Sequence, residues 1–133
     1  MKEFGLSKRE RIKSRKQLEK LFSYGKTLYS KKSRFKAVLY LLKDSDETGV
    51  KVVFAVYKKA GNAVWRNRVK RLMREAYRLN KSILYEVPVE NLLLLSFSPS
   101  RINQRNSRKI TLHDVVPDIV ELLEQIRTKL TEK

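Results

Sequence analysis

The sequence contains no cysteine, only one histidine and one tryptophan among 133 residues. The lack of cysteine excludes a disulfide framework and a thiolate zinc site, and it fits a reducing cytosol. Apolar runs are short, and none approaches the roughly 18–20 residues needed to cross a bilayer. The charged N-terminus lacks the apolar segment of a secretion signal. We therefore expect a soluble, cytoplasmic protein with no membrane partner.

Acidic residues are scarce, because 14 Asp and Glu face 31 Lys and Arg, which gives a net charge of +17. The excess is concentrated in residues 1–36 (+10), 58–81 (+8) and 101–110 (+4). Such an excess opposes folding through self-repulsion and is normally relieved by an anionic partner. No basic segment has the broad Trp, Phe and Leu face of a membrane-surface helix. Nucleic acid is therefore the favoured partner.

Capping residues and apolar spacing predict three helices in a chain long enough for one domain. Ser14 and Gln17 have capping-box spacing at the start of a short helix that ends at Gly25. Asn62 is the natural N-cap of a long helix that ends near residue 80 or 81. Pro117 is placed in the first turn of a C-terminal helix, whose apolar positions are Val116, Ile119, Val120, Leu123, Ile126 and Leu130.

Strands are predicted at residues 35–42, 50–57 and 91–98, with a further short strand near 27–30. The turn-rich segment KDSDETG predicts that the first two form an antiparallel hairpin. The continuous apolar run at 91–98 is typical of a central strand covered on both faces. The order α-β-β(-β)-α-β-α predicts an α+β fold with a small mixed central sheet and helices packed on it.

The long helix that follows Asn62 is strongly amphipathic at 100° per residue. Its apolar arc contains Trp65, Val69, Leu72, Met73, Ala76 and Leu79. Like charges stacked four residues apart repel one another, and only Glu75 interrupts them, which favours polyanion binding over a solvated face. Guanidinium groups bridge phosphate oxygens in pairs. The polar arc contains Arg66, Asn67, Lys70, Arg71, Arg74 and Arg78, with Arg68 at its border.

One face of the predicted sheet mixes aromatic and cationic side chains. It carries Tyr40 and Tyr57, and Phe22 lies beside it if the first helix packs at the sheet edge. Aromatic rings stack on unpaired bases, although ordinary core or edge positions explain these residues equally well. The basic helix lies between strands, unlike the tight helix-turn-helix of DNA readers, so RNA is favoured over DNA.

The segment KKAGNAVWRNRVKRLMREAYR, residues 58–78, resembles the signature of the bacterial ribonuclease P protein family. LSKRERIKS and LFSYG near the N-terminus, and the late apolar strand and helix, extend the resemblance over nearly the whole chain. It implies a non-catalytic subunit, one per RNA, of the ribonucleoprotein endoribonuclease that removes the 5′ leader of precursor tRNA. It also implies a left-handed βαβ crossover, against the usual handedness.

Two sets of site residues follow from the resemblance and the helix pattern. We expect residues 1–133 to form a single RNA-binding domain, with residues 1–13 as a basic N-terminal arm. Contacts to the catalytic RNA are implied for Asn62, Arg66, Asn67, Arg68, Lys70, Arg71, Arg74 and Arg78. A cleft for the single-stranded leader is implied at Leu18, Phe22, Tyr40, Tyr57, Lys58 and Lys59.

Side chains for catalysis by the protein itself are few. His113 is typical of a surface or capping residue, and Glu75 is best explained by pairing with Arg71 or Arg78. Asp44, Asp46 and Glu47 could hold a divalent ion but are more typical of a solvated turn. We expect no metal on the protein and Mg²⁺ acting through the catalytic RNA. A general RNA chaperone or ribosome-associated protein, and a protein metallonuclease, remain as alternatives.

Overall fold

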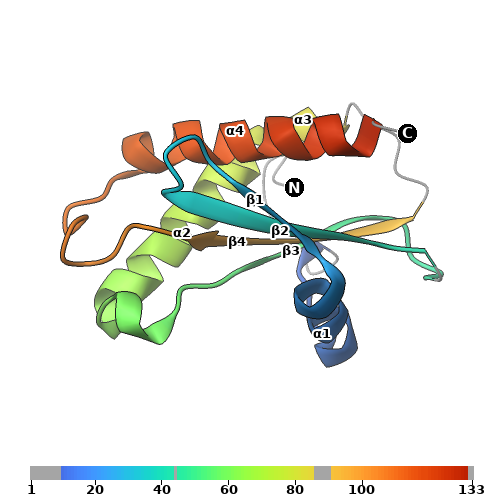
Figure 1. Ribbon diagram of the computed structural model, residues 1–133, viewed down its shortest axis with the longest axis horizontal. Helices are drawn as coiled ribbons and strands as arrows, with labels where there is room; N and C mark the ends of the chain where they lie inside the picture. The colour runs from blue at the N-terminus through green and yellow to red at the C-terminus, as the bar shows by residue number, and fades with distance from the viewer. Residues whose placement is uncertain (1–9, 44, 86–90, 132–133) are drawn as a thin grey trace, which may run out of the picture.

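A mixed four-stranded sheet in the order β1-β2-β4-β3 forms the centre of the structure. The computed structural model describes residues 10–43, 45–85 and 91–131. The strands are β1 (Lys26–Tyr29), β2 (Phe35–Leu42), β3 (Gly49–Phe54) and β4 (Leu92–Pro99). The helices are α1 (Arg15–Tyr24), the 3-10 helix η2 (Lys58–Ala60), α2 (Ala63–Asn80), α3 (Ser82–Tyr85) and α4 (Leu112–Thr131) (Figure 1). The predicted α+β fold and the short strand β1 are confirmed; α3 was not predicted.

Strand β4 lies between β2 and β3, so the predicted β2–β3 hairpin is wrong. β4 pairs antiparallel with β2, with Tyr40 opposite Leu94, and parallel with β3, with Val53 opposite Ser96. Its residues from Leu92 to Phe97 are all buried. A strand that is apolar on both faces is stabilised most by neighbours on both edges, and this outweighs the short turn between β2 and β3. The parallel β3–β4 pair requires a crossover through α2 and α3, and its predicted left hand stays a prediction.

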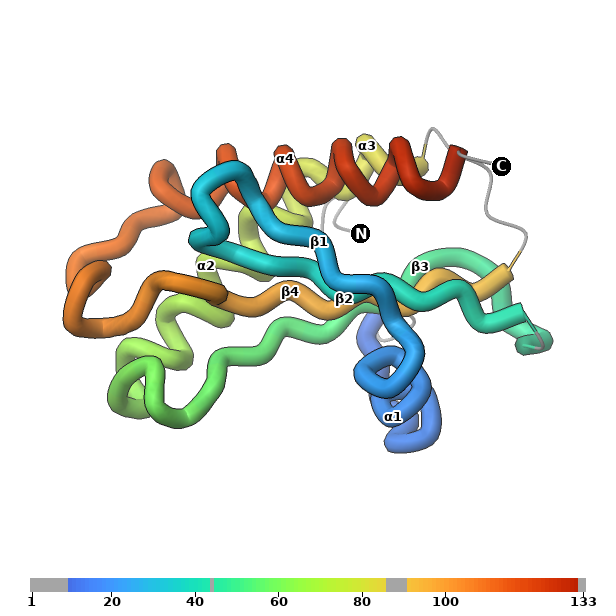
Figure 2. Tube along the Cα trace, viewed as in Figure 1, coloured from blue at the N-terminus to red at the C-terminus, as the bar shows by residue number. Residues whose placement is uncertain are grey.

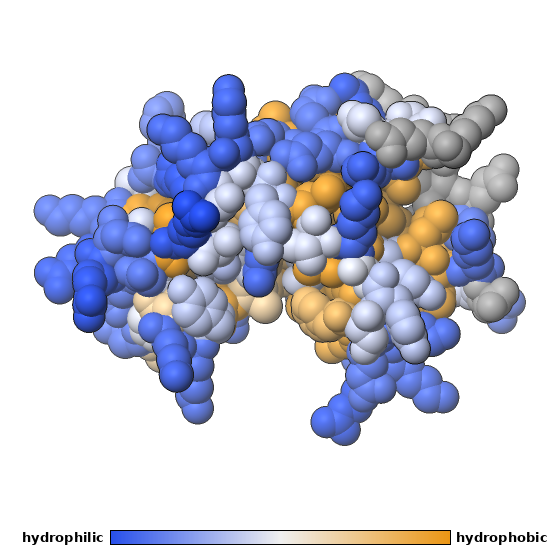
Figure 3. All heavy atoms as spheres, viewed as in Figure 1, coloured by the Kyte–Doolittle hydropathy of each residue, from blue (hydrophilic) through white to orange (hydrophobic). Residues whose placement is uncertain are grey.

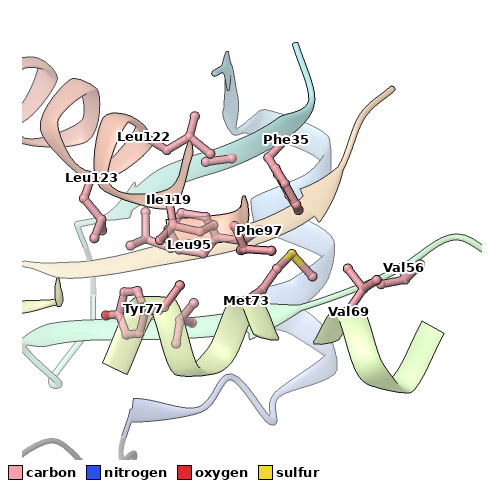
Figure 4. Close-up of a cluster of buried hydrophobic side chains, with 14 of the residues drawn as sticks. Phe35, Val56, Val69, Met73, Tyr77, Leu95, Phe97, Ile119, Leu122 and Leu123 are labelled. Atoms are coloured by element: carbon pink, nitrogen blue, oxygen red, sulfur yellow. The ribbon is translucent and has the colours of Figure 1, made fainter. Parts of the chain in front are cut away.

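Helices α2 and α4 cover one face of the sheet and enclose the main core. Met73 of α2, Phe97 of β4 and Ile119 of α4 are fully buried there. The ring of Tyr77 packs 5.6 Å from that of Phe97 and 5.8 Å from that of Phe54, between centroids. Figure 4 shows the core side chains meeting between the sheet and the two helices. Tyr77 lies outside the apolar arc predicted for this helix.

Helix α1 packs on the opposite face of the sheet, apart from the other helices (Figure 1). Leu21 is fully buried against Leu92 and Leu94, and Leu18 is partly buried beside them. The predicted cap is confirmed, because the Ser14 hydroxyl accepts a hydrogen bond from the Gln17 amide at 3.3 Å. α1 therefore covers one half of this face and leaves the other half to solvent.

Helix α4 begins one turn earlier than Pro117 suggested. Asp114 Oδ2 accepts hydrogen bonds from the backbone and the hydroxyl of Thr111, both at 2.9 Å. This arrangement caps the helix before Leu112, so Pro117 lies in the second turn. The buried face also differs from the predicted one, because Val115 and Leu122 are fully buried and were not among the predicted apolar positions.

The chain before α1 is docked against the outer edge of β3. The amide of Ile12 donates to the carbonyl of Val52 at 3.2 Å, and Arg11 forms a parallel bridge with Val52. Lys81 Nζ at the end of α2 donates to Glu10 Oε2 at 2.7 Å. Of the predicted basic arm, residues 1–9 lie outside the described residues, whereas Arg11 and Ile12 are held to β3 and Glu10 to Lys81.

Candidate nucleic-acid interface

The outer face of α2 carries three cations, Lys70, Arg71 and Arg74, that no acid among the described residues neutralises. Within the described part of the chain, Lys70, Arg71 and Arg74 have no hydrogen-bond or ion-pair partner. Arg78 forms a bidentate ion pair with Glu75, so Arg78 and not Arg71 is the partner of this acid. The hydrogen bond from Arg78 lowers the pKa of Glu75, so this carboxylate stays ionised at neutral pH. The face remains strongly positive along its length.

Asn62 and Arg66 stabilise the beginning of α2. Asn62 Oδ1 accepts from the Trp65 amide at 2.9 Å, which confirms the predicted N-cap. Arg66 Nε donates to the carbonyl of Gly61 at 3.1 Å. Asn67 is exposed on the same turn. Of the predicted RNA contacts, Asn62 and Arg66 thus also have structural partners.

Arg68 points toward another segment rather than along the cationic face. Its Nε and Nη2 atoms both donate to the carbonyl oxygen of Ile110, at 3.0 and 2.8 Å. Ile110 is buried and closes the loop between β4 and α4. The guanidinium group therefore joins α2 to that loop.

The loop at residues 101–110 carries four exposed cations beside the start of α2. The amide of Gln104 donates to the carbonyl of Ala60 at 2.7 Å, and Gln104 Oε1 accepts from the Asn62 amide at 2.8 Å. Trp65 Nε1 donates to the carbonyl of Ser107 at 3.0 Å. In Figures 1 and 2 the loop and the start of α2 lie at the same end of the molecule. Sequence reasoning did not include this loop in the site; its +4 charge was the only signal.

A pocket of about 260 Å³ opens on the half of the sheet that α1 leaves uncovered. Phe22 and Tyr57 both line the pocket, and they are 56% and 48% exposed. The pocket is lined by Phe22, Lys36, Val38, Ala55, Val56, Tyr57, Ser96, Ser98 and Pro99. Large aromatic rings exposed at the wall of a pocket are suited to stacking on planar ligands.

Strand register explains why this half of the face is hollow. Lys36 lies opposite Ser98 and Val38 opposite Ser96, in the antiparallel β2–β4 pair. Ala55 continues the pairing of β3, because its amide donates to the carbonyl of Phe97 at 3.1 Å. The small side chains of Ala55, Ser96 and Ser98 thus line the pocket together with Lys36 and Val38.

The structure divides the predicted cleft residues into three groups. Phe22 and Tyr57 come together at the pocket. Leu18 and Tyr40 instead pack against the small core under α1 and do not line the pocket. Lys58 and Lys59 lie in η2, immediately after Tyr57, and both are exposed.

The residues that the structure describes do not fit a metal ion. Among them, no group of three or more His, Asp or Glu side chains is close enough to hold one. Glu47 pairs with Lys51 Nζ at 3.0 Å, and Asp46 and His113 are exposed, while Asp44 lies outside the described residues. Within the same residues, every helix is too short or too polar to cross a bilayer.

Comparison with known sequences assigns the family. The family model described as ribonuclease P matches residues 6–116. The chain belongs to the ribonuclease P protein family. It is 41% identical over 81 residues to the ribonuclease P protein component of Syntrophus aciditrophicus, and 38% identical over 79 residues to that of Bacillus velezensis. These alignments cover 61% and 59% of this chain and 64% and 65% of the relatives, slightly less than two thirds of their length.

Solved structures of ribonuclease P proteins share the fold. The protein from Thermotoga maritima superimposes with a TM-score of 0.68 at 22% identity, covering 87% of this chain and 96% of that one. The protein from Staphylococcus aureus gives a TM-score of 0.61 at 22% identity, covering 96% and 97%. The resemblance predicted from residues 58–78 is therefore confirmed at the level of family and fold.

Proposed function

We propose that this chain is the protein subunit of ribonuclease P, which binds the catalytic RNA and assists removal of the 5′ leader from precursor tRNA. The observation that carries the proposal is the outer face of α2, where Lys70, Arg71 and Arg74 have no partner within the described residues. Three adjacent cations without acids fit a phosphate backbone, whose condensed counterions they release on binding. Exposed Asn67 adds a hydrogen-bonding group to the same surface.

The pocket between Phe22 and Tyr57 is proposed to hold the single-stranded leader. Its exposed rings suit stacking on unpaired bases, and Lys36, which also lines the pocket, supplies a positive charge for a phosphate. α2 packs on the other face of the sheet. One protein can therefore contact the catalytic RNA and the leader at the same time.

In this proposal the chemistry belongs to the RNA and its Mg²⁺, and the protein is a non-catalytic subunit. The protein contributes positive charge that offsets repulsion between two RNAs, and stacking surfaces that hold the substrate. It acts as a single RNA-binding domain in the cytoplasm, with one protein per catalytic RNA.

The proposal is tested by cleavage of precursor tRNA at low Mg²⁺, with the catalytic RNA of the same genome and with or without this protein. We expect the protein to increase substrate affinity and rate. The variant Lys70→Ala/Arg71→Ala/Arg74→Ala is expected to lose this effect while its circular dichroism stays unchanged. No gain from the wild-type protein would contradict the proposal.

The two alternative functions give different results in the same assay. A general RNA chaperone or ribosome-associated protein binds unrelated structured RNAs as tightly as the catalytic RNA. A protein metallonuclease cleaves RNA without the catalytic RNA, and loses this activity on Asp44→Ala or Asp46→Ala. Protein-only and unrelated-RNA reactions therefore accompany each measurement.

A further inference from the structure

We propose that the loop at residues 101–110 is a second RNA-backbone contact surface, and that Arg68 is the positioning residue that holds it beside α2. The inference rests on the proposed function, because it assigns further contacts to the same RNA. It differs from the resemblance, which implies a direct RNA contact for Arg68 and none for the loop.

The charge of the loop is not neutralised by any acid among the residues that the structure describes. Residues 101–110 contain no acid. The side chains of the four loop cations are exposed and have no hydrogen-bond or ion-pair partner in the described ranges 10–43, 45–85 and 91–131. These cations are Arg101, Arg105, Arg108 and Lys109. Figure 3 shows strongly hydrophilic side chains gathered at the end of the molecule where this loop lies.

The loop has a fixed internal conformation. The Oδ1 atoms of Asn103 and Asn106 each accept a hydrogen bond from the backbone amide of the other residue, both at 2.9 Å. Asn106 Nδ2 also donates to the carbonyl of Arg101 at 3.0 Å. Ile102 and Ile110 are buried at the two ends. Because these contacts order the backbone in advance, the cations bind a polyanion without a large loss of loop entropy.

The loop also has a fixed position relative to α2. Gln104 and Ser107 hold its middle to the start of the helix, and Arg68 holds its end through both hydrogen bonds to Ile110. A planar guanidinium with two donors makes this geometry, whereas a lysine ammonium cannot reproduce it. The pocket of about 310 Å³ formed by Lys59, Gln104 and Arg105, with their neighbours, lies at the junction. The cations of the loop and of η2 thus form one surface with the start of α2.

The first experiment measures binding to transcribed catalytic RNA as a function of salt. We expect weaker binding by the loop variant Arg101→Ala/Arg105→Ala/Arg108→Ala/Lys109→Ala. The slope of the logarithm of the binding constant against the logarithm of the salt concentration should fall in magnitude by about 1 for each phosphate that the variant no longer binds. A charge control, Lys31→Ala/Lys32→Ala in the turn between β1 and β2, is compared with Arg105→Ala/Arg108→Ala. We expect the loop pair to weaken binding more than the control pair does.

The second experiment separates positioning from direct contact. Arg68→Lys keeps the charge but removes the two-donor geometry, so amide exchange of residues 103–110 should accelerate and RNA affinity should fall. Arg71→Lys on the same helix is the matched control and should leave loop exchange unchanged. In the loop variant, Arg68→Lys should have little further effect on affinity.

Several outcomes overturn the proposal. In one, the loop variant binds with wild-type affinity and salt dependence while Lys70→Ala/Arg71→Ala/Arg74→Ala binds more weakly. That result would contradict the RNA contact of the loop and leave the proposed function intact. Unchanged affinity in both variants would instead contradict the proposed function. Additive effects of Arg68→Lys and the loop variant, or unchanged loop exchange in Arg68→Lys, would show that Arg68 is no positioning residue.

Discussion

The ammonium group of Lys81 lies 2.7 Å from Oε2 of Glu10, which joins the end of α2 to the chain that precedes α1. The Lys81 side chain is 6% exposed and the Glu10 side chain 20% exposed. Removing the charge of one member of a pair this deeply buried is costly, because the other charge keeps its desolvation penalty.

We therefore predict that Glu10→Gln lowers the free energy of unfolding by about 2–3 kcal/mol, somewhat less than for a fully enclosed pair. Amide exchange at Ile12, which donates to Val52, should accelerate as well. Urea denaturation and hydrogen exchange measure the two effects. The double variant Glu10→Gln/Lys81→Met should lose less stability than Glu10→Gln alone, and an equal or larger loss would contradict the explanation.

Replacing both pocket aromatics, Phe22→Ala/Tyr57→Ala, should selectively weaken binding of precursor tRNA to the assembled enzyme. Stacking of a base on an aromatic ring contributes about 1–3 kcal/mol, so we expect at least about a tenfold loss of affinity. Mature tRNA, which has no leader, should bind with little change. Tyr29→Ala removes a ring that is 50% exposed outside the pocket and serves as the control. Equal losses of affinity for precursor and mature tRNA would argue against a leader site.

Gly61→Ala should disturb the packing between the 101–110 loop and α2. A Cβ atom at Gly61 would lie 2.8 Å from Cβ of Gln104 and 2.8 Å from Cε3 of Trp65. Overpacking of this kind costs about 1–3 kcal/mol, and it should accelerate amide exchange at Gln104. Gly49→Ala is the control, because its φ of 105° causes strain while no atom lies within 4 Å of the new Cβ. It should destabilise the protein without changing loop exchange.

Asp114 and Asp118 lie on one helix but should respond oppositely to pH. Hydrogen bonds from the backbone and hydroxyl of Thr111 lower the pKa of Asp114 below its ordinary 3.8. Its stabilising effect is therefore complete above pH 3.8 and is lost as the pH falls through the lower folded-state value. Asp114→Asn should reduce the melting temperature at pH 7, and the reduction should shrink on acidification.

Burial raises the pKa of Asp118 above 3.8, although Arg34 at 3.5 Å opposes the shift. A raised carboxyl pKa stabilises the folded state fully below pH 3.8, and this contribution is lost as the pH rises through the folded-state value. Asp118→Asn should therefore raise the melting temperature at pH 7, and the gain should fade toward pH 3.8. Thermal melts between pH 3 and 7 test both variants, and parallel pH profiles would contradict the assignment.

Local signals in the sequence were sufficient for the starts of α1 and α2 and for the two faces of the sheet, but not for α3 or for the start of α4. Asn62 marked the start of α2, and the alternation in β2 and β3 separated the main core from the face that carries Lys36 and Tyr57. The order of the strands in the sheet could not be predicted from such local signals. A short turn favours pairing of sequence neighbours, whereas the position of β4 depends on how all the apolar faces are covered together.

The docking of the 101–110 loop on α2 could not be predicted from the sequence either, for a different reason. Trp65 and Arg68 bind the loop through the backbone carbonyls of Ser107 and Ile110, and a carbonyl is the same in every residue type. Arg68 therefore looked like one more cation on a basic helix. Only the geometry of its two hydrogen bonds distinguishes it from Arg71.

The central place of β4 also constrains how the chain folds. β2 and β3 make no ladder with each other, and both pair with β4, whose residues follow their partners by 50–64 positions for β2 and by 43 for β3. During synthesis the sheet therefore cannot be completed until β4 has left the ribosome, although β1, β2 and β3 are made earlier. Pairings between such distant segments raise contact order and slow folding, and the unpaired edges exposed meanwhile favour aggregation. A polyanion that binds only the folded protein would shift the folding equilibrium toward the native state.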